Sequence, residues 1–230
     1  IMADAMEEVA DIASIASSVV INMGTLNERT IPSMIAAGKA ANKAGIPVVF
    51  DPVGAGASRL RNETAVQILE EVDMSVLCGN ISEVRFLSGK KSLIKGVDAS
   101  DYDMRNPEDS VSIAKLLATR LDCVVAITGA VDVISDGKQT VCIENGNPML
   151  SNLTGTGCMC SSLIGAFCGA APCRSLDATI AALLSMGIAG EIAHAEAGQQ
   201  GNGSFRMALH DAVSRMDSDT LMRRASLYEA

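Results

Sequence analysis

Short apolar runs alternate with amphipathic stretches along the first half of the chain. Four runs predict buried strands, at residues 18–22, 47–50, 75–78 and 123–127. The intervening segments space their apolar residues as helices do, and they predict helices at 7–16, 31–44, 62–72, 82–87 and 107–121. Gly45 suits the C-cap of the second helix, and Pro107 suits the first turn of the fifth. Strands that alternate with helices indicate parallel βαβ units with both sheet faces covered.

The pattern changes after residue 127. Two short apolar runs flank the turn Asp136-Gly137 and predict an antiparallel hairpin, which we expect residues 148–150 to extend. The rest of the chain is expected to be helical, at 161–170, 176–197 and from 204 onward, and the polar segment 92–106 to be a surface excursion. We therefore expect one α/β domain over residues 1–230, with a mostly parallel sheet, helices on both faces and an antiparallel edge hairpin.

Composition excludes some classes of function and indicates where in the cell the protein acts. Of the 230 residues 48% are hydrophobic but only 3% aromatic, so aliphatic side chains must form the core. The net charge of −9 excludes non-specific binding to nucleic acid or to an anionic membrane, which needs a surplus of Lys and Arg. No apolar run is expected to approach the ~18 residues that span a bilayer. Seven cysteines without a C-x-x-C pair indicate free thiols rather than zinc ligands, and we expect a cytoplasmic protein.

Polar and glycine-rich segments follow four of the predicted strands. They are residues 22–25, 51–56, 79–83 and 128–132. Ligands of open α/β sheets bind beyond the carboxyl ends of the strands, so we expect these segments to converge on a site.

A fifth segment, Gly155-Thr156-Gly157, precedes a predicted helix. Glycines there expose backbone N–H groups at a helix N-terminus, which is an arrangement that holds phosphate as an anion hole. An ordinary helix start is an equally good interpretation of this segment alone. Neither a P-loop nor a complete dinucleotide-binding glycine motif is present.

Cys158 comes directly after this turn. The helix dipole and nearby N–H groups stabilise a thiolate there, and a thiolate could remove a proton from a hydroxyl that accepts a phosphoryl group. The alternative is a small buried apolar residue. Cys160 is the rival, but it points to a different side of the helix, so Cys158 is preferred.

Two carboxylates are candidates for magnesium. Asp51 and Glu83 each lie at or just after a strand end, and Mg²⁺ is commonly held by one or two carboxylates together with phosphate oxygens. The alternatives are a turn-forming Asp before Pro52 and a solvated Glu in the first turn of a helix. His194 and His210 lack partners at helical spacing, so we expect them to be structural or exposed.

Several motifs in one order closely resemble the hydroxyethylthiazole kinase family of the ribokinase-like superfamily. They are Asp51-Pro52-Val53-Gly54-Ala55-Gly56-Ala57, Gly79-Asn80-x-Ser82-Glu83, Thr128-Gly129-x-Val131-Asp132 and Thr154-Gly155-x-Gly157-Cys158. The resemblance covers nearly the whole chain and implies a three-layer ribokinase-like fold. It implies ATP-dependent phosphorylation of 5-(2-hydroxyethyl)-4-methylthiazole in thiamine salvage, and a homotrimer with substrate sites at subunit interfaces.

The resemblance also assigns roles to individual residues. Cys158 matches the catalytic Cys of the family, and Asp51 and Glu83 match its magnesium-associated carboxylates. Two further sets complete the site: nucleotide contacts at Asn80, Thr128 and Cys78, and thiazole contacts at Met2 and Gly155.

Two departures from the family pattern leave other functions open. Cys78 replaces an Arg that contacts phosphate, which should weaken ATP binding by roughly 1.5–3 kcal/mol unless another cation, such as Lys95, substitutes. The family also carries a strand and a helix before Met2, so we expect the chain to be short by about thirty residues. A truncated non-catalytic relative, or a kinase for another small alcohol such as a hydroxymethylpyrimidine, is the alternative.

Overall fold

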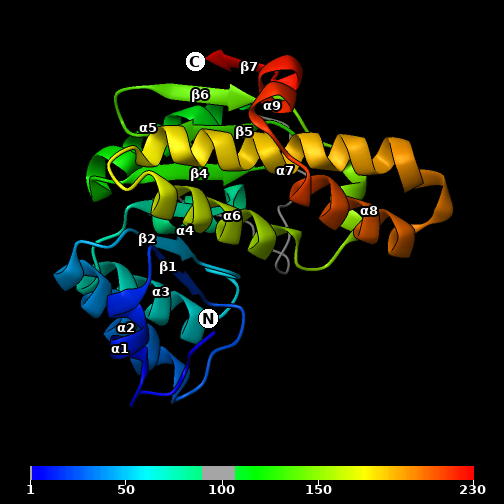
Figure 1. Cartoon of the computed structure of the whole chain (residues 1–230). Helices are drawn as coiled ribbons and strands as arrows, with labels where there is room; N and C mark the ends of the chain where they lie inside the picture. Colours follow the sequence, from blue (N-terminus) through cyan, green and yellow to red (C-terminus); the bar gives the residue numbers. More distant parts are fainter. Residues whose placement is uncertain (1, 90–106) are drawn as a thin grey trace.

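A computed structural model describes residues 2–89 and 107–230, whose strands form one seven-stranded sheet in sequence order (Figure 1). The first four strands are parallel and the next three add on in antiparallel fashion. The parallel strands are β1 (Val19–Asn22), β2 (Val48–Asp51), β3 (Val76–Asn80) and β4 (Val124–Thr128). The antiparallel strands are β5 (Asp132–Ser135), β6 (Thr140–Ile143) and β7 (Leu227–Glu229). The expected α/β class and the antiparallel hairpin are confirmed.

Helices cover both faces of this sheet. One face carries α2 (Thr30–Ala44), α3 (Arg59–Glu71), α4 (Ile81–Leu87) and α5 (Pro107–Leu121), with α1 (Val9–Ile15) packed on α2. The other face carries α6 (Thr156–Ala170) and α7 (Ser175–Ala197), and α8 (Asn202–Ser214) and α9 (Ser218–Arg224) pack on α7. Short 3-10 helices lie at η2 (Pro148–Asn152) and η3 (Gly198–Gln200).

Alternation along the strands separates the two apolar cores. In β2, Val48 and Phe50 pack toward α2 and α3, whereas Val49 packs toward α6 and α7. Leu77 in β3 repeats this division between its neighbours Val76 and Cys78. Every residue of β2 is buried, and residues 48–50 are all apolar, which is typical of a parallel sheet covered on both sides.

Most predicted elements are confirmed, and three expectations were wrong. Residues 148–150 belong to η2 rather than to a strand, because the Asn147 side chain accepts the Met149 N–H and starts a 3-10 turn. The C-terminal segment is not helical throughout, since β7 pairs with the free edge of β6. Helix α6 begins at Thr156, five residues before the predicted start. The expected surface excursion at 92–106, with Lys95, lies outside the described residues.

The helical stretch Ser175–Gln200, formed by α7 and η3, is long and apolar enough to cross a membrane by length and composition alone, although no apolar run of that length was expected. About two thirds of its apolar stretch is buried inside the molecule. It packs across the sheet on one side and against α8 on the other (Figure 1). We therefore interpret α7 as a core helix.

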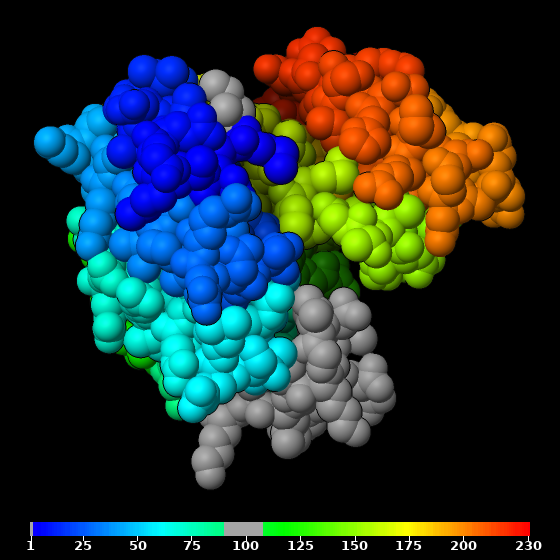
Figure 2. Space-filling model, turned by 90° about the horizontal axis from the view of Figure 1, so that it is seen from below, coloured from blue at the N-terminus to red at the C-terminus, as the bar shows by residue number. Residues whose placement is uncertain are grey.

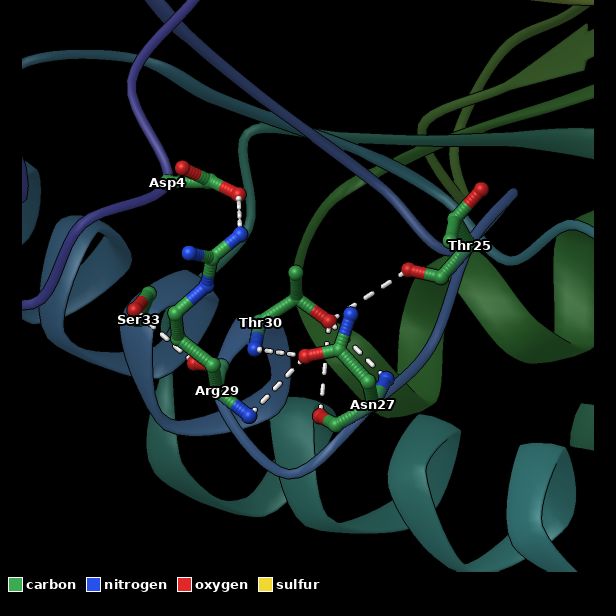
Figure 3. A network of polar contacts seen from close by, with 6 residues as sticks. All are labelled: Asp4, Thr25, Asn27, Arg29, Thr30 and Ser33. Carbon is green, nitrogen blue, oxygen red and sulfur yellow. Dashed lines mark hydrogen bonds and ion pairs between the residues drawn. The ribbon is translucent and has the colours of Figure 1, made fainter.

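The loop between β1 and α2 is fixed by local hydrogen bonds (Figure 3). The Asn27 side chain accepts the backbone N–H groups of Arg29 and Thr30, while the Thr30 hydroxyl accepts the N–H of Asn27. The exposed ion pair between Asp4 and Arg29 ties the N-terminal segment to the same loop. These contacts hold the chain where it leaves the end of β1.

Candidate active site

The carboxyl ends of β1 to β4 meet at one edge of the sheet, as expected. Asn22 lies beside Asp51 in the register of β1 and β2, and Asn80 lies beside Thr128 in the register of β3 and β4. Figure 2 shows a recess between the blue and cyan N-terminal half and the yellow-green residues that lead into α6. The polar strand ends therefore share one site.

Asp51 is buried at the end of β2, with only 5% of its surface exposed. Its Oδ2 accepts hydrogen bonds from Asn22 Nδ2 and from Ser161 Oγ of α6, each at 2.7 Å. Burial raises the pKa of this carboxyl to about 6, although the bonds from Ser161 and Asn22 oppose the rise. Asp51 thus links three elements and is more than a turn-forming residue before Pro52.

Glu83 is buried in the first turn of α4, so the alternative of a solvated glutamate is wrong. Its Oε1 accepts the Gly54 N–H at 2.7 Å and its Oε2 accepts the Asn80 N–H at 2.8 Å. The Asn80 side chain in turn accepts the Glu83 N–H, which completes a capping box. Burial raises the pKa of Glu83 to about 7, with a further upward contribution from Asp51.

Arg61 of α3 joins the loops that follow β1 and β2. Its guanidinium donates to the carbonyls of Met23, Val53 and Gly24, at 2.5, 2.6 and 3.0 Å. Its charge also lowers the pKa of Glu83. Sequence analysis missed Arg61, because a side chain that binds backbone carbonyls leaves no motif.

The glycine turn and the start of α6 form the opposite side of the site. Gly155 has a φ of 100°, which glycine adopts without strain, and the first helical hydrogen bond runs from the Met159 N–H to its carbonyl. The three N–H groups before that bond, those of residues 156–158, have no acceptor among the described residues. The Thr156 hydroxyl instead anchors the turn to the carbonyls of Leu150 and Leu153.

Cys158 is exposed at this helix start, so the alternative of a buried apolar residue is wrong. Its Sγ accepts a hydrogen bond from Asn22 Nδ2 at 3.3 Å. Close packing makes the contact possible, because a Cβ on Gly165 of α6 would come within 2.6 Å of Val20 in β1. Cys160 lies on a different side of the helix, as expected, where it packs against the core, and burial raises its pKa far above the ordinary value.

A hollow of about 340 Å³ lies beside Cys158. Its wall is mostly apolar and comes from α6 and from α8. The lining residues are Gly155, Cys158, Met159, Ser162, Leu163 and Val213. This hollow has room for a small organic group next to the thiol.

The remaining predicted site residues range from fully buried to fully exposed. Cys78 is buried in the core between the sheet and α6, and burial raises its pKa well above the ordinary value. The Thr128 hydroxyl donates to the Gly79 carbonyl at 3.4 Å, so it lies beside the start of α4. Met2 is fully exposed and does not line the hollow beside Cys158. His194 and His210 are exposed on helices, as expected.

Asp51 and Glu83 fit a magnesium ion by the chemistry of their oxygens. They are buried carboxylates that interact electrostatically, and Asp51 Oδ1 has no hydrogen-bond partner among the described residues. A group of three or more His, Cys, Asp or Glu suited to a metal does not occur in residues 2–89 and 107–230. Phosphate oxygens and water would therefore have to complete the coordination, as is usual for Mg²⁺.

Comparison with solved structures defines the class of protein. The chain matches pyridoxal kinase from Staphylococcus aureus in complex with ADP with a TM-score of 0.58 and 19% identity, over 81% of this chain and 67% of that one, which is a likeness of fold alone. It matches the hydroxyethylthiazole kinase protein of Pyrococcus horikoshii OT3 with a TM-score of 0.88 and 36% identity, over 100% and 84% of the two chains. The fold is therefore that of the ribokinase-like kinases.

Sequence comparison identifies the family. The model of the hydroxyethylthiazole kinase family matches residues 1–219. Hydroxyethylthiazole kinases of Ruminiclostridium cellulolyticum and Clostridium beijerinckii are 55% and 56% identical to all of this chain, which covers 83% of each. The chain belongs to the hydroxyethylthiazole kinase family, and it is a kinase.

Proposed function

We propose that the protein transfers the γ-phosphoryl group of ATP to the hydroxyl of 5-(2-hydroxyethyl)-4-methylthiazole. One observation supports this most strongly. The exposed thiol of Cys158 lies at the N-terminus of α6, and the Asn22 amide links it by hydrogen bonds to the buried carboxylate of Asp51. The names of the relatives supply the alcohol. The apolar hollow beside Cys158 has room for its aromatic ring.

The chemistry divides between the two sides of the site. The N–H groups of residues 156–158 lie at the start of α6 without an acceptor among the described residues, so they would act with Gly155 as the anion hole for the phosphoryl oxygens. Cys158 accepts the hydroxyl proton as the alcohol oxygen forms its bond to the γ-phosphorus and the bond to the β-phosphate oxygen breaks. ADP leaves. Asp51 and Glu83 would hold Mg²⁺, which neutralises phosphate charge when it is bound.

The nucleotide is proposed to bind at the ends of β3 and β4. Asn80 and Thr128 are neighbours there, and the capping box fixes the backbone at Asn80. Cys78, at the nucleotide-contact position of the family motif, is buried and offers no charge to phosphate. ATP binding therefore depends on the backbone N–H groups and on other cations.

The assembly and the location are also proposals. The fully exposed Met2 is suited to a thiazole contact that a neighbouring subunit completes, as in a homotrimer with sites at its interfaces. We also propose a single kinase domain over residues 1–230. The seven free cysteines suit the cytoplasm, and the net charge of −9 disfavours nucleic-acid or membrane partners.

The experiment is steady-state turnover of Mg²⁺-ATP with the thiazole alcohol. Cys158→Ala should lower kcat by about 100-fold or more, because a positioned general base contributes at least that much. Cys173→Ser, which changes the other exposed thiol, should keep the wild-type kcat. Full kcat in Cys158→Ala would remove Cys158 as the base. A higher kcat/KM for a hydroxymethylpyrimidine than for the thiazole alcohol would show that the pyrimidine is the preferred substrate.

A further inference from the structure

Asn22 occupies the last position of β1, beside Asp51. Its Oδ1 accepts the Gly24 N–H at 2.8 Å. Its Nδ2 lies 2.7 Å from Asp51 Oδ2 and 3.3 Å from Cys158 Sγ. The side chain therefore has a partner for every one of its polar atoms on the described part of the chain, and two of those partners belong to the candidate active site.

These contacts determine which way the amide points. If the amide were turned over, its oxygen would face the Asp51 carboxylate and its NH₂ group would face the Gly24 N–H, and both encounters are repulsive. The two amide hydrogens must therefore point at Asp51 and Cys158. Since an amide hydrogen can only be donated, both groups must act as acceptors, and the sulfur accepts best as a thiolate.

We propose that Asn22 is a positioning residue that holds the Cys158 sulfur at a fixed place beside Asp51. One amide spans β1, β2 and α6, so the sulfur is fixed relative to the carboxylate before any substrate binds. The catalytic consequence rests on the proposed function, because a fixed sulfur helps only if Cys158 accepts the hydroxyl proton. The effect on the sulfur itself does not rest on it.

Ser161 supplies the matched control. Like Asn22, it donates a 2.7 Å hydrogen bond to Asp51 Oδ2, but its hydroxyl does not hydrogen-bond to Cys158. Ser161→Ala removes a donor from the carboxylate and leaves the sulfur untouched. Asn22→Asp keeps the acceptor for the Gly24 N–H, and Asn22→Ala adds no charge. A change that appears in both Asn22 variants and not in Ser161→Ala therefore belongs to the contact with Cys158.

The first test measures alkylation of Cys158 by iodoacetamide at pH 7, in a Cys173→Ser background, with the modified peptide identified by mass spectrometry. Asn22→Asp keeps an acceptor for the Gly24 N–H but removes both donors. It should slow alkylation about 5- to 20-fold, because a charge-assisted hydrogen bond to the thiolate is lost. Asn22→Ala should slow it about 3- to 10-fold, and Ser161→Ala should stay within about twofold of the parent.

Circular dichroism and thermal unfolding establish that each variant is folded. If Asn22→Asp does not fold, Asn22→Ala carries the same comparison. Alkylation of a folded Asn22 variant at the parent rate overturns the proposal, and so does an equal slowing in Ser161→Ala.

The second test separates positioning from substrate binding. Asn22→Asp should lower kcat for the thiazole alcohol about tenfold or more, with the KM for the alcohol changed less than threefold, because the sulfur is misplaced while the pocket is kept. An unchanged kcat overturns the catalytic part of the proposal. Slow alkylation in Asn22→Asp alongside a parent protein without kinase activity would overturn the proposed function instead, and the positioning role would stand.

Discussion

The two sides of the candidate active site are built in opposite ways. On the carboxylate side, Asp51 and Glu83 are buried and accept hydrogen bonds from β1, α6 and the backbone. On the glycine side, Cys158 is exposed and the backbone N–H groups of residues 156–158 have no acceptor among the described residues. A Cβ on Gly155 or Gly157 would meet nothing within 4 Å.

The difference separates what folding requires from what a ligand requires. Polar groups buried on the carboxylate side need their partners for the protein to fold, because a buried donor without an acceptor costs stability. The open N–H groups at the start of α6 contribute nothing to folding, since water can satisfy them until an anion arrives. Substitutions on the carboxylate side should therefore cost both stability and activity, whereas those on the glycine side should cost mainly activity.

Glu83→Ala gives the largest expected effect and tests the carboxylate side. It leaves the N–H groups of Gly54 and Asn80 without their acceptor in a buried site, so the free energy of unfolding should fall by ~2–4 kcal/mol. Urea denaturation measures this loss, and kcat should fall as well. Glu70→Ala, an exposed change on α3, should leave both quantities unchanged. If Glu83→Ala lost activity at full stability, the contrast between the two sides would be wrong.

The sequence predicts the fold and most of the site because each depends on local patterns. Continuous apolar runs such as 123–127 indicate parallel strands, and Gly45, with its φ of 68°, ends α2 where its residue type predicts. Asp51, Glu83 and Cys158 could be selected because strand ends and helix starts collect ligands.

Long-range contacts account for what the sequence does not predict. Ser161 lies 110 residues after Asp51, and only the packing of α6 across β1 and β2 brings them together. Asn22 was recognised as part of a polar strand end, but its role depends on Cys158, 136 residues later. Similarly, β7 forms because β6 offers a free edge, a property of the assembled sheet rather than of residues 227–229.

A matched pair of glycine variants tests whether substitutions on the glycine side affect activity more than stability. Gly155→Ala places a side chain at a φ of 100° and should lower the free energy of unfolding by ~1–2 kcal/mol. Gly157→Ala should leave stability unchanged or raise it slightly, because alanine favours helix and its Cβ meets open space. Its methyl group would nevertheless occupy space in front of the N–H groups, so kcat/KM should fall about 10- to 100-fold. Unchanged kcat/KM in Gly157→Ala would show that phosphoryl oxygens do not collect at this turn.

Asp132 is a partly buried residue outside both sides, and it tests whether burial raises the pKa values in this region. Burial raises its pKa from the ordinary 3.8 to about 7, and the Gly129 N–H bond to its Oδ1 opposes the rise. Between about pH 4 and 7 the folded state therefore keeps a proton that the unfolded state has released. Because of this difference, Asp132 makes the free energy of unfolding fall as pH rises through that window.

The prediction concerns the change in stability with pH. Between pH 5.5 and 7.5, Asp132→Asn should flatten the decline in the free energy of unfolding by roughly 2 kcal/mol, measured by urea denaturation with EDTA. Asp51 and Glu83, with pKa values of about 6 and 7, contribute declines of the same sign and remain in the variant. Asp136→Asn is the control, because hydrogen bonds from backbone N–H groups lower the pKa of Asp136 and move its titration below the window. An identical slope in Asp132→Asn and the parent would show that burial is not what sets this pKa, and the same reasoning would then have to be withdrawn for the carboxylate side.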